Sequence, residues 1–196
     1  MISILLQTWG GLGYLLNKVL FSRAERSSNS KTKKNYRIWS WIAYLSALPA
    51  WIIVFISEDN WIAAAVEFGG APSMIMGLLI ALKGNGKQTK YVNHFAKVFV
   101  LLGLCLSLNK TGGLFQLTQL IELGIACGFL LGTYFLAKDA LSGYLWLVLG
   151  NISCAILMGL EEFYILMSQQ IISLLFVLDA YFVRRRNLNR NDFIKD

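Results

Sequence analysis

The sequence is poor in charge, proline, cysteine and histidine. Of its 196 residues, 15% are charged and 56% are hydrophobic, whereas soluble domains carry about a quarter charged residues. Two prolines and few polar runs argue against disorder. The single histidine, His94, argues against a histidine-based catalytic metal site. The three cysteines lie in apolar runs without CxxC spacing, so they predict buried packing residues and neither a disulfide framework nor a metal site.

Long apolar segments fill the chain and leave no room for a soluble domain. A membrane-spanning helix needs about 20 residues, and backbone groups in lipid must be satisfied within the helix. The seven segments are 2–20, 38–56, 61–82, 92–108, 114–137, 141–160 and 163–183. We therefore expect an all-α polytopic membrane protein with seven transmembrane helices, a single transmembrane domain over 1–183 and a basic cytoplasmic tail over 184–196.

Basic residues gather on one side of this arrangement. If the N-terminus is outside, 17 of the 18 lysines and arginines fall in loops 21–37, 83–91 and 138–140, in the tail, or at adjoining helix ends such as those of Lys18 and Lys97. The outward loops carry Glu58, Asp59, Glu161 and Glu162. The positive-inside rule then predicts the N-terminus out, the C-terminus in, and a multi-pass protein of the cell inner (plasma) membrane.

The basic stretch 23–37 has two interpretations. It is either a solvated cytoplasmic loop that fixes topology or a site for anionic lipid.

A faint internal repeat divides the chain. Residues 13–16 match 128–131 at an offset of 115, and Glu67 matches Gln170 at an offset of 103. The fourth segment has no counterpart. This predicts a three-plus-one-plus-three plan, with repeat one at about 2–83, a linker helix at about 92–108 and repeat two at about 114–183. Two such halves would be related by a two-fold axis along the membrane normal. The alternative is chance similarity among apolar helices.

Polar residues within the apolar segments are costly in lipid and are typical of cavities or of helix pairing. Glu67 lies beside Gly69 and Gly70, which permit close approach of a helix or a ligand. The candidate solute-binding residues are Glu67, Trp146, Asn151, Gln170, Gln169, Glu122, Gln119 and Tyr44. The alternative for the amides is interhelical hydrogen bonding, worth about 0.6 kcal/mol each, and for Tyr44 an interfacial aromatic. Asp179 is expected to pair with the basic cluster 184–186.

The stretch from Tyr144 to Arg186 resembles the last two helices of the nicotinamide riboside transporter (PnuC) family, within the wider SWEET-like group. Trp146 and Asn151 match the family's tryptophan–asparagine pair, although they are five residues apart and the family usually spaces them by four. The resemblance implies a seven-helix facilitator of vitamin-like solutes such as nicotinamide riboside, riboflavin or thiamine. It also implies no ATP use, trapping of the solute by a cytoplasmic kinase, and a homotrimer.

Together these observations predict a facilitative transporter of a small vitamin-like solute, with a nicotinamide riboside-like compound as the first guess. The alternatives are a non-transporting inner-membrane protein, acting as an assembly partner or sensor, and a sugar facilitator. An enzyme is not expected, because no nucleophile–base set is visible. No GxxxxGK[ST] motif occurs. We expect no cofactor, no metal and no nucleic-acid partner; the expected partners are the solute and the lipid bilayer.

Overall fold

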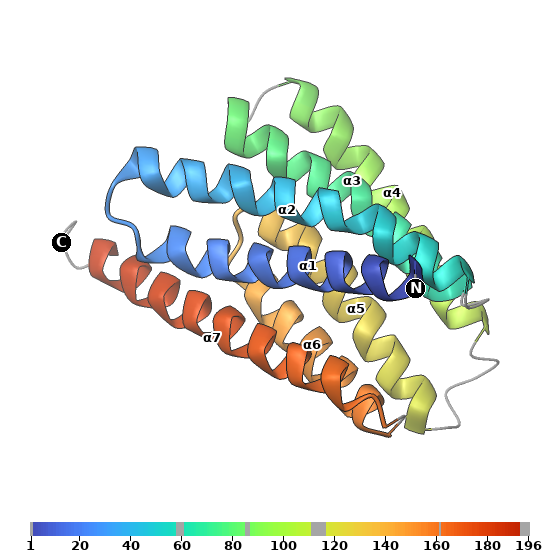
Figure 1. Cartoon of the computed structure of the whole chain (residues 1–196). Coiled ribbons are helices and arrows are strands. Elements are labelled where there is room, and N and C mark those ends of the chain that lie inside the picture. The colour runs from blue at the N-terminus through green and yellow to red at the C-terminus, as the bar shows by residue number, and fades with distance from the viewer. Residues whose placement is uncertain (1, 58–60, 85–86, 111–116, 161, 193–196) are drawn as a thin grey trace.

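The computed structural model describes residues 2–57, 61–84, 87–110, 117–160 and 162–192, and every regular element in these ranges is a helix. Long helices lie side by side in one bundle (Figure 1). They are α1 (Ile2–Arg26), α2 (Ser30–Ser57), α3 (Trp61–Lys83), α4 (Lys87–Lys110), α5 (Leu117–Ala137), α6 (Ser142–Leu160) and α7 (Tyr164–Asp192). The predicted all-α fold is confirmed. Glu58, Asp59 and Glu161, which were expected in outward loops, lie outside the described residues.

Five of these helices, α2, α3, α5, α6 and α7, are long and apolar enough to cross a membrane. Within the residues that the structure describes, α1 and α4 are not among these five helices. The bundle also exposes large apolar side chains, including Leu117 at 70% and Ile165 at 86%. Such a surface is stable when hydrocarbon covers it and costly in water. The chain therefore forms a membrane-embedded helical protein.

The helices extend further than the apolar segments predict. The loop expected over 21–37 is wrong, because α1 continues to Arg26 and α2 begins at Ser30. Asn29 caps α2, since its side-chain oxygen accepts the backbone N–H of Lys31 at 2.9 Å and that of Thr32 at 3.3 Å. Likewise α7 continues to Asp192 through the basic segment. Apolarity sets the part of a helix that can lie in lipid, whereas capping residues decide where the helix begins.

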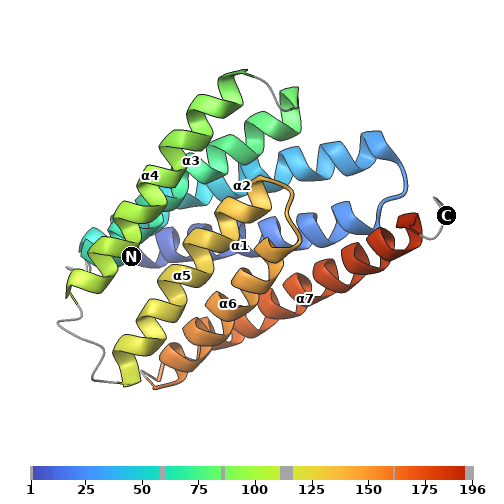
Figure 2. The ribbon, with the colours of Figure 1, turned by 180° about the vertical axis from the view of Figure 1, so that it is seen from behind.

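Six helices form a closed series of neighbours. Each of α1, α2, α3, α5, α6 and α7 packs against the next in that order, and α7 packs back against α1. The remaining helix, α4, lies against α3 and α5 (Figures 1 and 2). The series brings helices from opposite ends of the chain together, and it places polar side chains of α1 against those of α2, α3 and α7.

Glycines set two close helix crossings. A Cβ added at Gly13 in α1 would lie 2.6 Å from the Cβ of Ala47 in α2. One added at Gly128 in α5 would lie 2.3 Å from the Cα of Gly150 in α6. Separations this short exclude any larger side chain unless the backbones move apart. The pairs α1–α2 and α5–α6 therefore depend on small residues at their crossing points.

We predict that Gly128→Ala destabilises the protein by about 1–3 kcal/mol, because the new methyl group overlaps backbone atoms of α6 that cannot move independently. Gly70→Ala is the control, because its Cβ would meet only the flexible end of Met74 at 3.4 Å. Unfolding of both variants in detergent should show a loss for the first and little change for the second. Equal stability of the two would contradict the proposed crossing.

Candidate functional site

A group of buried and half-buried polar side chains lies between α1, α2, α3 and α5. Tyr14 donates a hydrogen bond to the carboxylate of Glu67, and its ring packs edge-on against Tyr44 with centroids 4.6 Å apart. The Tyr44 hydroxyl lies 3.4 Å from the hydroxyl of Thr133. The Nζ of Lys18 lies 4.7 Å from the centroid of the Tyr44 ring. We call these five residues the inner polar cluster.

The helical repeat explains how α1 contributes to this cluster. Tyr14 and Lys18 are four residues apart and so lie on one face of α1. Lys18 is only 4% exposed, although it carries an ammonium group. Glu67 is the carboxylate that interacts electrostatically with it. The ammonium of Lys18 and the carboxylate of Glu67 thus attract one another within the bundle, although no hydrogen bond joins them among the described residues.

Several buried polar atoms of the bundle, some of them in the cluster and some outside it, have no hydrogen-bond partner among the described residues. They are Asn17 Oδ1, Lys18 Nζ, Trp51 Nε1, Ser73 Oγ and, on α6, Asn151 Oδ1. An unsatisfied buried donor or acceptor costs about 1–3 kcal/mol. Trp51 belongs to the surroundings of the cluster, because its ring centroid is 6.2 Å from that of Tyr14. These atoms offer donors and acceptors that a polar solute can satisfy.

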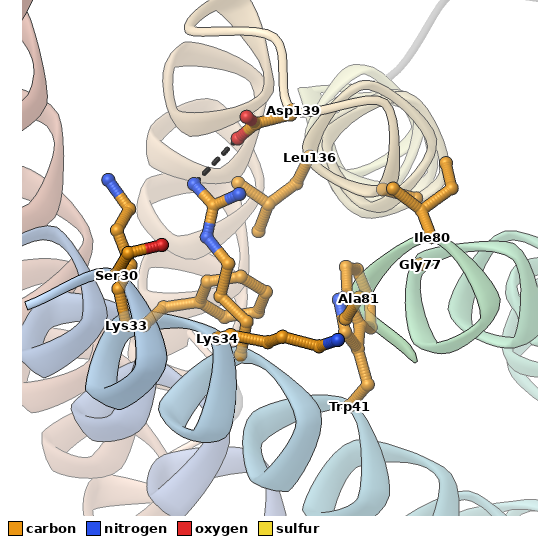
Figure 3. Close-up of a pocket in the computed structure, with 12 residues that line it drawn as sticks. Ser30, Lys33, Lys34, Trp41, Gly77, Ile80, Ala81, Leu136 and Asp139 are labelled. Atoms are coloured by element: carbon orange, nitrogen blue, oxygen red, sulfur yellow. Dashed lines mark ion pairs between the residues drawn. The ribbon is translucent and has the colours of Figure 1, made fainter. Parts of the chain in front are cut away.

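Trp41 lies between the inner polar cluster and a cavity of about 260 Å³. Its ring stacks on Tyr44 with centroids 6.3 Å apart and fits over Gly77, where a Cβ would be 2.3 Å from the indole. Figure 3 shows the cavity with the side chains that surround it. The lining residues are Phe21, Ser30, Lys33, Lys34, Arg37, Trp41, Gly77, Ile80, Ala81, Leu136, Ala137 and Asp139. We call this space the basic cavity.

A layer of ion pairs lies at the same end of the bundle and is centred on Glu25 in α1. The Glu25 side chain is fully buried. It accepts hydrogen bonds from Arg37 at 2.7 Å, Lys33 at 2.9 Å and Arg184 at 3.1 Å. The Tyr144 hydroxyl donates a fourth bond, also at 3.1 Å. This layer ties α1 to α2, α6 and α7.

The turn between α5 and α6 completes the charged layer. Asp139 pairs with Arg37 at 2.6 Å and with Arg184 at 2.8 Å. Burial raises the pKa of the Glu25 carboxyl, but Arg37, Lys33 and Arg184 outweigh that effect and lower its pKa to about 2. Glu25 is therefore ionised throughout the physiological pH range.

Glu25→Gln should destabilise the protein by about 3 kcal/mol at neutral pH, because it leaves three cations without their shared anion. A lowered pKa stabilises the fold above the ordinary value of 4.5, and that stability is lost as the pH falls towards about 2. The stability difference from wild type should thus stay constant between pH 8 and 5 and shrink below pH 4.5. The exposed carboxylate Glu122 provides the control, because Glu122→Gln leaves the ion pairs of Glu25 intact. Unfolding in detergent is measured from pH 8 to below pH 4.5. A stability difference that does not shrink below pH 4.5 would contradict the ion-pair role.

Two of the residues selected from sequence meet in the inner polar cluster, and two others lie apart. Tyr44 and Glu67 are both members. Asn151 is buried in α6, where its amide donates to the Leu147 carbonyl at 2.6 Å within the same helix. Gln170 is half-buried in α7. Because α3 packs against neither α6 nor α7 among the described residues, this structure does not join Glu67 to Asn151 or Gln170.

The other candidates occupy separate neighbourhoods. Gln169 donates to the Gly11 carbonyl at 3.2 Å and so links α7 to α1. Trp146 and Gln119 are half-buried, and Glu122 is exposed. A solute-binding role for these residues stays a prediction.

Lys18 is the main residue that sequence reasoning missed. It was grouped with the basic residues at the cytoplasmic helix ends, whereas the structure buries it beside Glu67. A partial signal was available, because Lys18 and Tyr14 are four residues apart and so would share a face of a helix. Tyr14, Thr133 and Trp51 were also absent from the predicted site.

The expected partner of Asp179 is also wrong. Asp179 was expected to pair with the basic cluster 184–186 on its own helix. Instead it accepts hydrogen bonds from Arg26 and Ser22. The reason is that α7 packs along α1, so that Asp179 faces the last two turns of α1.

Comparison of the chain with protein-family models, with curated proteins and with solved structures finds no match. The fold and the site therefore define only a class, which is a membrane-embedded helical protein with a buried polar cluster. In the described residues, no group of three or more histidine, cysteine, aspartate or glutamate side chains could hold a metal ion.

Proposed function

We propose that the protein is a facilitative membrane transporter of a small vitamin-like solute and that the inner polar cluster forms part of its solute site. The observation that carries this proposal is the placement of an ammonium, a carboxylate and three hydroxyls among apolar helices, with Lys18, Tyr44 and Thr133 buried. Ionisable groups at membrane depth are expensive and typical of substrate pathways. Helix packing alone does not require ionisable groups at this depth.

Helix order supports a three-plus-one-plus-three plan with seven spans. If α1, α2 and α3 in the closed series trade places with α5, α6 and α7, respectively, the order of neighbouring helices stays the same. A second contact at the α1–α2 and α5–α6 crossings also follows the repeat. Gly13 approaches the Ala43 carbonyl, and Gly128 approaches the Trp146 carbonyl. Ala43 and Trp146 differ by the offset of 103 that relates Ala47 to Gly150. In this proposal α4 links two halves of equal orientation, with the N-terminus outside the inner membrane and the C-terminus inside.

Transport by rocking of two halves requires a polar site that opens to one side at a time. At one end of the inner polar cluster, Trp41 and the ion pairs of Glu25 close the bundle, as a site that is shut on one side requires. In the proposed cycle these contacts separate when the solute leaves towards the cytoplasm. The buried cluster then exchanges its internal hydrogen bonds for bonds to the solute.

The chemistry of the cluster suggests what the solute contains. Tyr44 and Trp51 offer aromatic faces for a flat ring, and the unpartnered atoms suit hydroxyl or amide groups. Lys18 and Glu67 balance one another in charge, so the solute needs no net charge. Nicotinamide riboside is the first compound to test because of the resemblance in the last two helices. Riboflavin and thiamine follow it.

Solute uptake into proteoliposomes tests the proposal. We expect Glu67→Gln and Tyr14→Phe to lower flux at least tenfold, because each removes one partner of the buried carboxylate–hydroxyl bond. Ser168→Ala is the control, since Ser168 is exposed and its hydroxyl donates to the Tyr164 carbonyl of its own helix. Asn151→Ala tests whether α6 also contributes to the solute site. Each variant is first compared with wild type by thermal unfolding, so that loss of flux is not confused with loss of fold.

Three outcomes would replace the proposal. No flux and no solute-dependent thermal shift in wild type would favour a non-transporting assembly partner or sensor. Flux of sugars alone would favour a sugar facilitator. Flux that survives Glu67→Gln and Tyr14→Phe but fails in Asn151→Ala would move the site to α6. The homotrimer implied by the resemblance is a separate proposal, which light scattering of the purified protein tests.

A further inference from the structure

We propose that the basic cavity binds a dianion of the phosphate class, either inorganic phosphate or a phosphate monoester. This site is distinct from the inner polar cluster, because Trp41 lies between them. The proposal does not depend on transport, since it concerns binding at the end of the bundle that carries the ion pairs.

One face of α2 supplies the cations. The α2 residues that line the cavity occupy positions 30, 33, 34, 37 and 41, which share a face of a helix. Figure 3 shows Lys33 and Lys34 on one side of the space, with Ile80 of α3 and Leu136 of α5 on other sides. Lys31 and Lys34 are both exposed, but of the two only Lys34 lines the cavity. The cations are therefore directed to a defined space with an apolar wall.

The charges around the cavity do not balance. Lys33, Arg37 and Arg184 share the carboxylates of Glu25 and Asp139, so this group already has one excess cation. The ammonium of Lys34 adds a second, and its bond is to a backbone carbonyl, that of Leu82, at 3.1 Å. Asp139 is the one acidic residue among the described side chains that line the cavity.

A phosphate dianion matches this surplus. Its two negative charges equal the two excess cations, and its oxygens accept from both lysine and arginine. The Nε of Arg37 is buried and has no hydrogen-bond partner among the described residues. Ser30 begins α2 and lines the cavity, so the positive end of the helix dipole also favours an anion there.

The volume favours a small ligand. Pockets for drug-sized molecules measure about 300–1,000 Å³, whereas the basic cavity measures about 260 Å³. The phosphate group could belong to a soluble molecule or to an anionic lipid headgroup. The chemistry of recognition is the same in both cases, and the experiment separates the two sources.

The test is thermal unfolding of the full-length protein in phosphatidylcholine nanodiscs with rising inorganic phosphate, against chloride at equal ionic strength. We expect phosphate to raise the unfolding temperature of wild type and chloride to have little effect. Lys34→Gln should weaken the apparent phosphate affinity about fivefold, which corresponds to about 1 kcal/mol. Lys31→Gln removes the same charge from the same helix outside the cavity and should leave the affinity unchanged.

Asp139→Asn should change the apparent phosphate affinity in the direction opposite to Lys34→Gln. It removes a negative charge from the cavity wall, so it should tighten phosphate binding about fivefold. The backbone φ of Asp139 is 60°, a conformation that asparagine adopts readily. A purely structural role for these residues would weaken binding in both variants, so opposite effects of Lys34→Gln and Asp139→Asn support the site.

Nanodiscs that also contain phosphatidic acid, the headgroup of which is a phosphate monoester, identify the source of the anion. Loss of the phosphate effect in these discs supports a lipid headgroup in the cavity, and an unchanged effect supports a soluble phosphate compound. The proposal is overturned if chloride stabilises wild type as much as phosphate does. It is also overturned if Lys31→Gln and Lys34→Gln behave alike, or if Asp139→Asn weakens binding.

Discussion

The architecture depends on one constraint, which is that the polar side chains of α1 must find partners inside the protein. Lipid supplies no hydrogen bonds, so each buried polar group needs a neighbour from another helix. Tyr14 finds Glu67 on α3, Asn17 finds the Ser40 carbonyl on α2 at 3.0 Å, and Glu25 finds cations on α2 and α7. An isolated α1 would be costly in the membrane, and the closed series of helices makes its burial favourable.

The sequence predicted the features that follow from composition and missed those that follow from packing. Long apolar runs predicted the helices, and the cost of a buried carboxylate identified Glu67. By contrast, Lys18 was assigned by its nearness to other basic residues, because only tertiary structure shows that α1 continues as a buried helix to Glu25. The partner of Asp179 was missed for the same reason. Contacts between residues distant along the chain depend on which helices pack together, and apolar periodicity leaves that undetermined.

The inner polar cluster and the ion pairs around Glu25 differ in net charge. In the cluster one ammonium faces one carboxylate, and the remaining groups are hydroxyls, so the site is electrically neutral. Around Glu25 and Asp139 the cations outnumber the acids. A neutral interior limits the electrostatic cost of burial, whereas surplus positive charge is tolerable only near water and anions. This contrast is the reason that we propose different ligands for the two regions.

Tyr44 holds a special position in the proposed repeat. The offset of 115 that relates α1 to α5 pairs Lys18 with Thr133, and both of these residues contact the same tyrosine. Residues related by a two-fold axis can meet at one side chain only if that side chain lies close to the axis. Tyr44 would then mark the centre of the bundle, where the two halves face each other. The halves would differ in chemistry there, because Lys18 and Glu67 of the first half correspond to Thr133 and Gln170 of the second. In the proposed site, the charged groups of the first half and the uncharged groups of the second half would both hold the solute by hydrogen bonds.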